Sequence, residues 1–275
     1  MTGPDIGTVR GYITKYSNWR RWGEDDERGT LNHVTSKDIT YAASLAKKGR
    51  SISMPLAFGE NGPQKATFNR FKPIAHVVFD NKTYNGHDAD QAPGKGATRN
   101  GVCNAAGGMV GRGVLLDIPR SMGVPWLEPG TAIGGEDLDR AASQQGVEIR
   151  KGDFVFVRTG SIARARAAGS SGDYAGGPAP GLGLKSIDWV AEHELAAIAT
   201  DTRGMEVLPN ETPDVLQPLH IVFIVHLGLW VGEFWDLDPL AVDCAADGIY
   251  EFLFCGPPLP STYAVGAPLN PMAIK

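Results

Sequence analysis

The sequence has 275 residues, of which 42% are hydrophobic and 21% charged, so it is long enough to bury a sizeable core. Its net charge of −5 at pH 7 offers no basic surface for nucleic acid or an anionic membrane. No apolar run approaches the roughly 20 residues that span a bilayer, and the first residues lack the pattern of a signal peptide. We therefore expect a soluble, cytoplasmic protein.

The three cysteines support the same expectation. Cys103, Cys244 and Cys255 are widely spaced, odd in number and form no CxxC motif. This pattern indicates buried thiols in a reducing compartment rather than a disulfide framework or a zinc knuckle.

Hydrophobic periodicity predicts helices and strands along most of the chain, without repeats or long linkers, so one domain over 1–275 is expected. Residues 50–101 are rich in Gly, Asn, Pro and Lys and predict loops and short strands. Helices are predicted from 35 to the glycine at 49 and over 136–145, 162–168, 186–194 and 239–246. Strands are predicted at 114–117, 154–157, 195–200, 219–225 and 229–235. This alternation is too irregular for a doubly wound parallel sheet and predicts a mixed α/β fold with a largely antiparallel sheet.

The most informative residues are His220 and Glu233, which bracket an apolar run and a glycine at 228. If 219–225 and 229–235 form a hairpin, the two side chains face each other with Cβ atoms about 4.5–5.5 Å apart. An imidazole and a carboxylate at that separation can share a metal ion. A buried His–Glu hydrogen bond that supports packing is the alternative. The same register places His226 about 20 Å away and excludes it from the site.

Other polar features have structural and functional interpretations. The acidic run at 24–27 is typical of a solvated or capping surface. Asp201, at the end of a predicted strand, either orients a ligand histidine or caps a turn. The sequence shows no GxGxxG, Walker lysine or GxSxG, so neither a phosphate-binding loop nor a serine nucleophile is indicated.

Ordered segments across nearly the whole chain resemble the cyclase family of metal-dependent hydrolases, which includes bacterial kynurenine formamidases and isatin hydrolases. The segments are 22–32 (WGEDDERGTLN), 110–117 (VGRGVLLD), 152–160, 173–182 (DYAGGPAPGL), 200–202, 208–212 (LPNET), 257–260 and 266–271. The resemblance implies a β-barrel-like core surrounded by helices and assembly into homodimers or larger homo-oligomers. It also implies that His220 and Glu233 bind a divalent metal, Zn or Mn.

The sequence departs from the family in its signature, HxGTHxDxxxH. In the family the first two histidines and the aspartate bind metal, and the last histidine acts as acid–base or supporting residue; one branch has Gln in place of the two leading histidines. Residues 75–80 (AHVVFD) match the segment with the last histidine, which makes His76 the catalytic candidate. The preceding 68–74 (FNRFKPI) resemble a segment from well upstream. An internal deletion is therefore expected at 74/75, through real loss, a mispredicted splice junction, or an engineered or incomplete sequence.

The expected deletion leaves the metal site short of ligands. A hydrolytic metal takes about three protein ligands and an open position for water, and the candidates for the third ligand are His76, Asp80, His87 and Asp88. The resemblance predicts hydrolysis of an amide or lactam C–N bond, as in an arylformamidase that acts on an N-formyl aryl amine or a cyclic amide. The alternative is a catalytically impaired pseudoenzyme that serves as a binding or assembly subunit.

Overall fold

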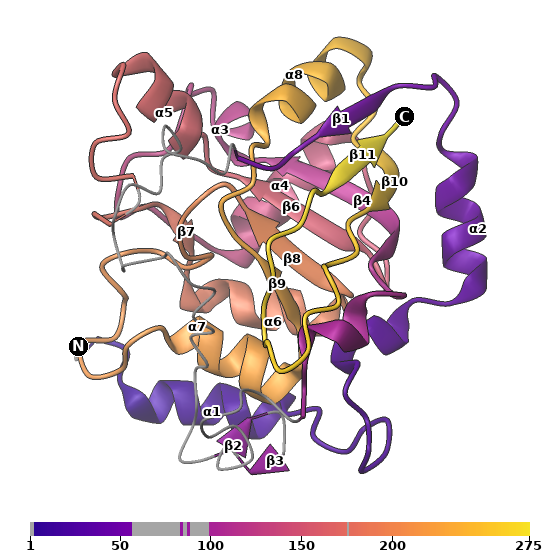
Figure 1. Cartoon of the computed structure of the whole chain (residues 1–275). Coiled ribbons are helices and arrows are strands. Elements are labelled where there is room, and N and C mark those ends of the chain that lie inside the picture. Colours follow the sequence, from indigo (N-terminus) through magenta and orange to yellow (C-terminus); the bar gives the residue numbers. More distant parts are fainter. Residues whose placement is uncertain (1–2, 57–82, 85–86, 89–98, 175) are drawn as a thin grey trace.

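A seven-stranded mixed sheet lies at the centre of the computed structural model, which describes residues 3–56, 83–84, 87–88, 99–174 and 176–275 (Figure 1). The strands, in their order across the sheet, are β1 (Ser51–Ser53), β11 (Met272–Ile274), β10 (Glu251–Cys255), β4 (Val110–Asp117), β6 (Phe154–Arg158), β8 (Ala197–Thr200) and β9 (Trp230–Gly232). The pairs from β1 to β4 are antiparallel, and those from β4 to β9 are parallel. The predicted mixed α/β class is confirmed: the core is a curled sheet surrounded by helices, with three antiparallel and three parallel pairings.

The central strands are buried on both faces, which explains their nearly continuous apolar sequences. In β6, Phe154 and Phe156 point to one core and Val155 and Val157 to the other. In β4, Leu115 shares a core with the phenylalanines. The alternation follows from the two-residue period of a strand.

Helices cover both faces of the sheet (Figure 1). The α-helices are α1 (Ile6–Tyr16), α2 (Ser36–Ser44), α3 (Ile118–Ser121), α4 (Gly135–Gln145), α5 (Ser161–Ala167), α6 (Ile187–Glu192), α7 (Pro218–His220) and α8 (Asp238–Asp247). Short 3₁₀ turns are η1 (Gly29–His33), η3 (Val102–Ala105) and η4 (Leu184–Ser186), and η5 (Ile221–Leu227) is a π-helix. α1, α4, α6 and η5 pack on the valine face, and α8 packs on the phenylalanine face. Within the described residues, no helix is long and apolar enough to cross a membrane.

Local sequence signals account for several helix boundaries. Thr35 and Asp38 form a reciprocal capping box at the start of α2. α4 ends at Gly146, whose φ of 63° is the left-handed conformation that glycine adopts without strain. The helices predicted at both places are confirmed, although α2 ends at Ser44 and not at the predicted glycine at 49.

The predicted hairpin of 219–225 and 229–235 is wrong. Residues 218–227 are helical, with Pro218 in the first turn and Gly228 at the end in the left-handed conformation. The helix ends against residues from the N-terminal region: the Trp19 Nε1–H donates to the Val225 carbonyl, and the Asn18 backbone and side-chain amides donate to the next two carbonyls. The following strand, β9, is shorter than predicted and pairs in parallel with β8.

Three small pairings lie outside the main sheet. β5 (Ala132–Ile133) pairs in parallel with β7 (Gly181–Leu182). β2 (Thr83–Tyr84) pairs with β3 (His87–Asp88) across the Asn-Gly dipeptide, and β2 lies against η5. The predicted deletion at 74/75, together with His76 and Asp80, lies outside the described residues, so the deletion stays a prediction.

Candidate metal centre

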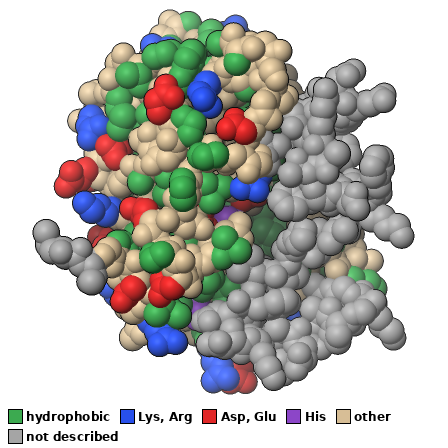
Figure 2. Space-filling model, turned by 90° about the vertical axis from the view of Figure 1, so that its left-hand side faces the viewer, with side chains coloured by type: hydrophobic (Ala, Val, Ile, Leu, Met, Phe, Trp, Pro, Cys, Tyr) green, Lys and Arg blue, Asp and Glu red, His purple; other side chains and the backbone are tan. Residues whose placement is uncertain are grey.

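His220 and Glu233 meet, although not across a hairpin. The Nε2 atom of His220, at the end of α7, lies 3.1 Å from the Oε1 atom of Glu233, which directly follows β9. His220 is buried, whereas the Glu233 side chain is 31% exposed. Figure 2 shows the side of the molecule that carries α5, β7 and α7, on which histidine side chains are visible among hydrophobic and charged ones.

A second carboxylate, Glu206, holds the other side of the His220 ring. Its Oε1 atom lies 2.5 Å from Nδ1 of His220 and also accepts the backbone N–H of His220 at 3.2 Å. The other oxygen accepts the Asn210 amide at 3.1 Å and the Leu219 backbone N–H at 3.3 Å. Glu206 is 1% exposed. The three side chains therefore form one line, Glu206–His220–Glu233, with the imidazole in the middle.

The backbone around Glu233 is fixed by the neighbouring strand. The N–H of Phe234 donates to the Thr202 carbonyl at 2.9 Å, and that of Trp235 donates to the Thr200 carbonyl at 3.1 Å. Phe234 has a φ of 61° and packs its ring against Tyr174. A left-handed conformation at a bulky residue is uncommon and turns the chain sharply just after Glu233. This turn lies at the carboxyl edge of parallel strands, where α/β proteins commonly place their sites.

The two carboxylates control the protonation of His220. Burial alone would lower the pKa of this imidazole, but the hydrogen bonds to Glu206 and Glu233 outweigh burial and raise the pKa to about 9. Without a cation between His220 and Glu233, the ring is therefore an imidazolium at neutral pH.

The donor set fits one side of a divalent-metal site. A carboxylate on Nδ1 leaves Nε2 as the metal-binding atom, which is the usual arrangement for metal-bound histidine. Two ligand atoms of a tetrahedral zinc site lie roughly 3.3 Å apart, given bonds of about 2.0–2.2 Å. The observed 3.1 Å between Nε2 and Oε1 is close to that spacing. A small outward shift of Glu233 would therefore admit a cation.

The described side chains offer no third ligand beside His220 and Glu233. Within residues 3–56, 99–174 and 176–275, no group of three His, Cys, Asp or Glu side chains is placed to hold a metal. His76 and Asp80 lie outside the described residues. The backbone of His87 and Asp88 forms β3, whose partner β2 lies against the helix that follows His220.

The other candidates have structural contacts. The Asp201 carboxylate accepts the backbone N–H groups of Thr159 and Gly160 and the Thr159 hydroxyl, each at 2.8 Å. Its described hydrogen bonds therefore cap the turn into α5, and burial raises the pKa of Asp201 to about 6. The His226 ring stacks on Trp19 with ring centroids 4.7 Å apart.

The acidic run at 24–27 acts in part as a capping segment. Asp26 accepts the Gly29 backbone N–H at 2.9 Å and the Asn32 amide at 2.7 Å. Glu27 accepts the backbone N–H of Asn100 at 2.9 Å. Both carboxylates hold loops rather than contacting the His220–Glu233 pair.

Glu206 is the residue that the sequence analysis missed. It lies between the buried residues Met205 and Val207. A lone carboxylate inside an apolar stretch has to be paired when it is buried. That local pattern is the signal that could have identified it.

Comparison with known proteins places the chain in a family. Residues 72–207 match the Cyclase family model. A crystal structure described as a novel cyclase is 30% identical, with a TM-score of 0.84, over 96% of this chain and 99% of that chain. The chain therefore belongs to the cyclase family.

More distant structures share the fold. Isatin hydrolase A from Ralstonia solanacearum is 16% identical, with a TM-score of 0.57, over 87% of this chain and 97% of that chain. Isatin hydrolase A from Labrenzia aggregata, bound to benzyl benzoate, is 17% identical, with a TM-score of 0.55, over 86% and 98%. No curated protein matches the sequence. The similarity to these enzymes supports a hydrolase-like fold.

Proposed function

We propose that the protein is a metal-dependent hydrolase of amide or lactam C–N bonds, with N-formyl aryl amines or cyclic amides as its substrates. The observation that carries the proposal is the line Glu206–His220–Glu233, which presents Nε2 and a carboxylate oxygen 3.1 Å apart at a partly open position. The similarity to isatin hydrolases, named for a cyclic amide, supports the substrate class.

In this proposal each residue has a defined task. His220 and Glu233 hold Zn or Mn through Nε2 and Oε1. When bound, the metal supplies Lewis-acid polarisation and lowers the pKa of water towards 7. Glu206 accepts the Nδ1–H of His220 and so keeps Nε2 free for the cation. His76 delivers a proton to the nitrogen of the leaving amine, a role carried over from the family signature.

The remaining ligand is proposed to come from the segment that contains His76, Asp80, His87 and Asp88. The chain enters this segment beside the site, because Pro55 forms an isolated bridge with Trp235, two residues beyond Glu233. Later in the same segment, β2 lies against η5, the helix that follows His220. These two anchor points support delivery of a ligand from the intervening chain.

The first experiment measures metal content and turnover of the purified full chain. After loading with Zn or Mn, we expect about one equivalent of metal, and hydrolysis of N-formylkynurenine or isatin. His220→Ala and Glu233→Gln are expected to lose most of the metal and at least about 100-fold in kcat/KM. His193→Ala is the matched control, because this half-buried histidine bonds to the Trp189 carbonyl.

Two outcomes would contradict the proposal. Less than about a tenth of an equivalent of metal, with no turnover of either substrate, would favour the catalytically impaired binding subunit. Turnover that survives His220→Ala would place the chemistry elsewhere.

We also propose a cytoplasmic homodimer or larger homo-oligomer. Family resemblance supports the assembly, and the unpaired cysteine pattern supports the reducing compartment. Light scattering coupled to size-exclusion chromatography measures the assembly directly.

A further inference from the structure

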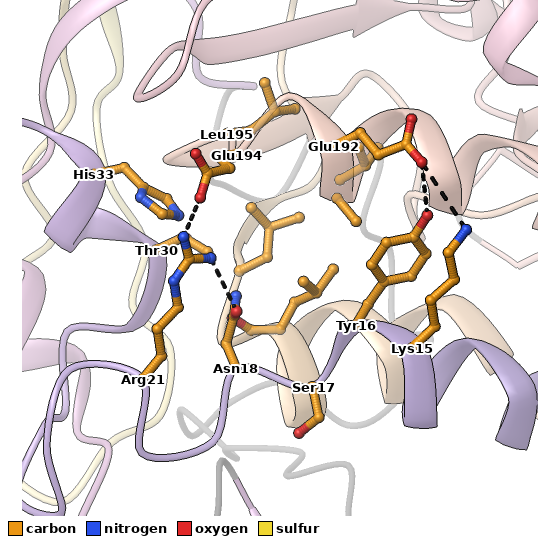
Figure 3. A pocket seen from close by; sticks show the side chains of 14 residues that line it. Lys15, Tyr16, Ser17, Asn18, Arg21, Thr30, His33, Glu192, Glu194 and Leu195 are labelled. Carbon is orange, nitrogen blue, oxygen red and sulfur yellow. Dashed lines mark hydrogen bonds and ion pairs between the residues drawn. The ribbon is translucent and has the colours of Figure 1, made fainter.

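A cavity separate from the candidate metal centre lies between the end of α1, η1 and the end of α6 (Figure 3). Its volume is about 300 Å³, at the lower end of the range for small-molecule sites. Neither His220, Glu233 nor Glu206 lines it. The cavity therefore has to be interpreted independently of the proposed hydrolysis.

The charged groups that line the cavity are already paired. Arg21 forms an ion pair with Glu194, which also binds Lys151 at 2.8 Å. At the other end, Lys15 lies 2.7 Å from Asp188. Glu192 accepts the Tyr16 hydroxyl (Figure 3). A charged ligand would have to break one of these pairs, whereas an uncharged ligand would leave them intact.

One buried polar side chain in the cavity wall is left without such a partner. His33 is 4% exposed and lines the cavity beside the Arg21–Glu194 pair (Figure 3). Among the described residues, neither ring nitrogen has a hydrogen-bond partner, and the ring packs edge-on against Trp22. Neither nitrogen is among the fully buried side-chain atoms that lack a partner in the described residues, so both are open to the cavity and available to a partner from solution.

The protonation of His33 defines what it can bind. Burial lowers the pKa of this imidazole to about 4, so it is neutral at pH 7. A neutral imidazole offers one N–H donor and one nitrogen acceptor. The ligand group that complements the His33 ring both accepts and donates a hydrogen bond, as an amide or an N–H heterocycle does.

Part of the cavity wall is apolar. Leu195, Leu227 and Leu229 line it together with Val190 and Ala191 of α6. Leu227 and Leu229 belong to the segment that joins His220 to Glu233, so an occupant would contact the chain between the two candidate metal ligands.

We propose that this cavity binds an uncharged small molecule with a ring-sized apolar body and an amide-like edge. The body packs on Leu195, Leu227 and Leu229, and the edge exchanges hydrogen bonds with the His33 ring. The ion pairs at both ends stay intact and exclude charged ligands of the same size.

The experiment titrates benzamide into the full chain labelled with ¹⁵N-histidine and records the imidazole resonances. A ligand with nine heavy atoms is expected to bind with a Kd of roughly 1–10 mM, so the titration extends to about 50 mM. The His33 resonances should shift saturably. Benzoate and benzylamine, which match benzamide in size but carry a charge, should bind at least about tenfold more weakly.

Two variants locate the site. His33→Phe removes the hydrogen-bonding edge, and Ala191→Leu narrows the cavity from α6, a different element from the one that carries His33. Each should weaken benzamide binding about tenfold. His193→Phe is the control, because His193 packs on Trp189 and does not line the cavity. If His33→Phe fails to fold, the wild-type shifts and Ala191→Leu still decide the question.

Three results would overturn the proposal. These are the absence of a saturable His33 shift, benzamide binding that is unchanged in Ala191→Leu, and tighter binding of benzoate or benzylamine than of benzamide.

Discussion

Glu206 holds Nδ1 of His220 at 2.5 Å, although the two residues are 14 positions apart in the chain. The same carboxylate accepts the backbone N–H groups of Leu219 and His220, so it fixes both the ring and the turn of helix that carries it. A carboxylate in this position raises the basicity of a metal-bound histidine and sets its tautomer. The hydrogen bond with Glu206 orients the His220 ring so that its Nε2 atom faces Glu233. The helix backbone alone would not fix the ring in this orientation.

The first prediction concerns Glu206→Gln. The amide keeps the shape of the side chain but carries no charge, so it no longer stabilises a metal-bound imidazole. We expect Zn or Mn to bind about 10–100-fold more weakly, measured by isothermal titration calorimetry.

Glu211→Gln is the control for this prediction. The Glu211 carboxylate accepts the Leu184 backbone N–H and has no described contact with His220. Equal metal affinity in Glu206→Gln and the wild type would show that Glu206 only supports packing.

The second prediction separates the two interpretations of Asp201. Because Asp201 accepts three hydrogen bonds from Thr159 and Gly160, Asp201→Ala leaves buried donors without an acceptor. We expect the free energy of unfolding to fall by about 3 kcal/mol in urea denaturation, with metal affinity unchanged. Loss of metal affinity without loss of stability would instead support a role in orienting a ligand histidine.

The third prediction is a pH dependence of stability that comes from His33. Its pKa is about 4 in the folded protein and about 6.5 when unfolded, because burial disfavours the charged ring. The unfolded state therefore binds the proton first as pH falls. The unfolding free energy is therefore highest above about pH 6.5 and falls as pH decreases from about 6.5 to 4, by roughly 1–3 kcal/mol after allowance for solvent screening.

His33→Phe isolates this contribution. Burial raises the pKa of Asp153 and Asp201 to about 6, so these groups act in the opposite sense and destabilise the fold as pH rises through 4 to 6. Asp153 and Asp201 contribute equally in the wild type and in His33→Phe. The difference between the unfolding free energies of the two proteins therefore contains only the contribution of His33. A difference in unfolding free energy that stays constant from pH 7.5 to about 4.5 would contradict the neutral state of His33.

The fourth prediction concerns Lys275, whose side chain is buried at the edge of the sheet. Its ammonium lies 3.1 Å from Asp243 and 2.9 Å from Asp247 and donates to the Ile249 carbonyl at 2.7 Å. Lys275→Met keeps the apolar stem but removes the charge that these carboxylates face. We expect a loss of about 3 kcal/mol in unfolding free energy, measured by urea denaturation.

Lys15→Met is the comparison, because Lys15 pairs with Asp188 on an exposed surface. Solvent screens such a pair, so the unfolding free energy should change little. If both substitutions had equal effects, burial would not be the reason for the contribution of Lys275.

Several elements could be predicted from short stretches of sequence. α2 begins at the Thr35–Asp38 capping box and α4 ends at Gly146, because these signals satisfy the ends of a helix locally. β6 was predicted because its apolar residues match a strand buried on both faces. Residues 218–227 form a helix although their sequence predicts a strand, because short apolar runs occur in both structures. What distinguishes it is contact with Asn18 and Trp19, about 200 positions away.

The sequence by itself indicated the family and the mixed α/β class, through ordered motifs and local periodicity. It indicated the pair His220 and Glu233 through resemblance to that family, because the hairpin predicted from periodicity does not form. The tertiary structure decided how that pair meets, because parallel pairing of β9 with β8 carries Glu233 back to the end of α7. It also decided that Glu206 completes the line and that His33 faces a cavity. Burial and hydrogen bonding between distant segments set these relationships, and they become visible only when the chain is folded.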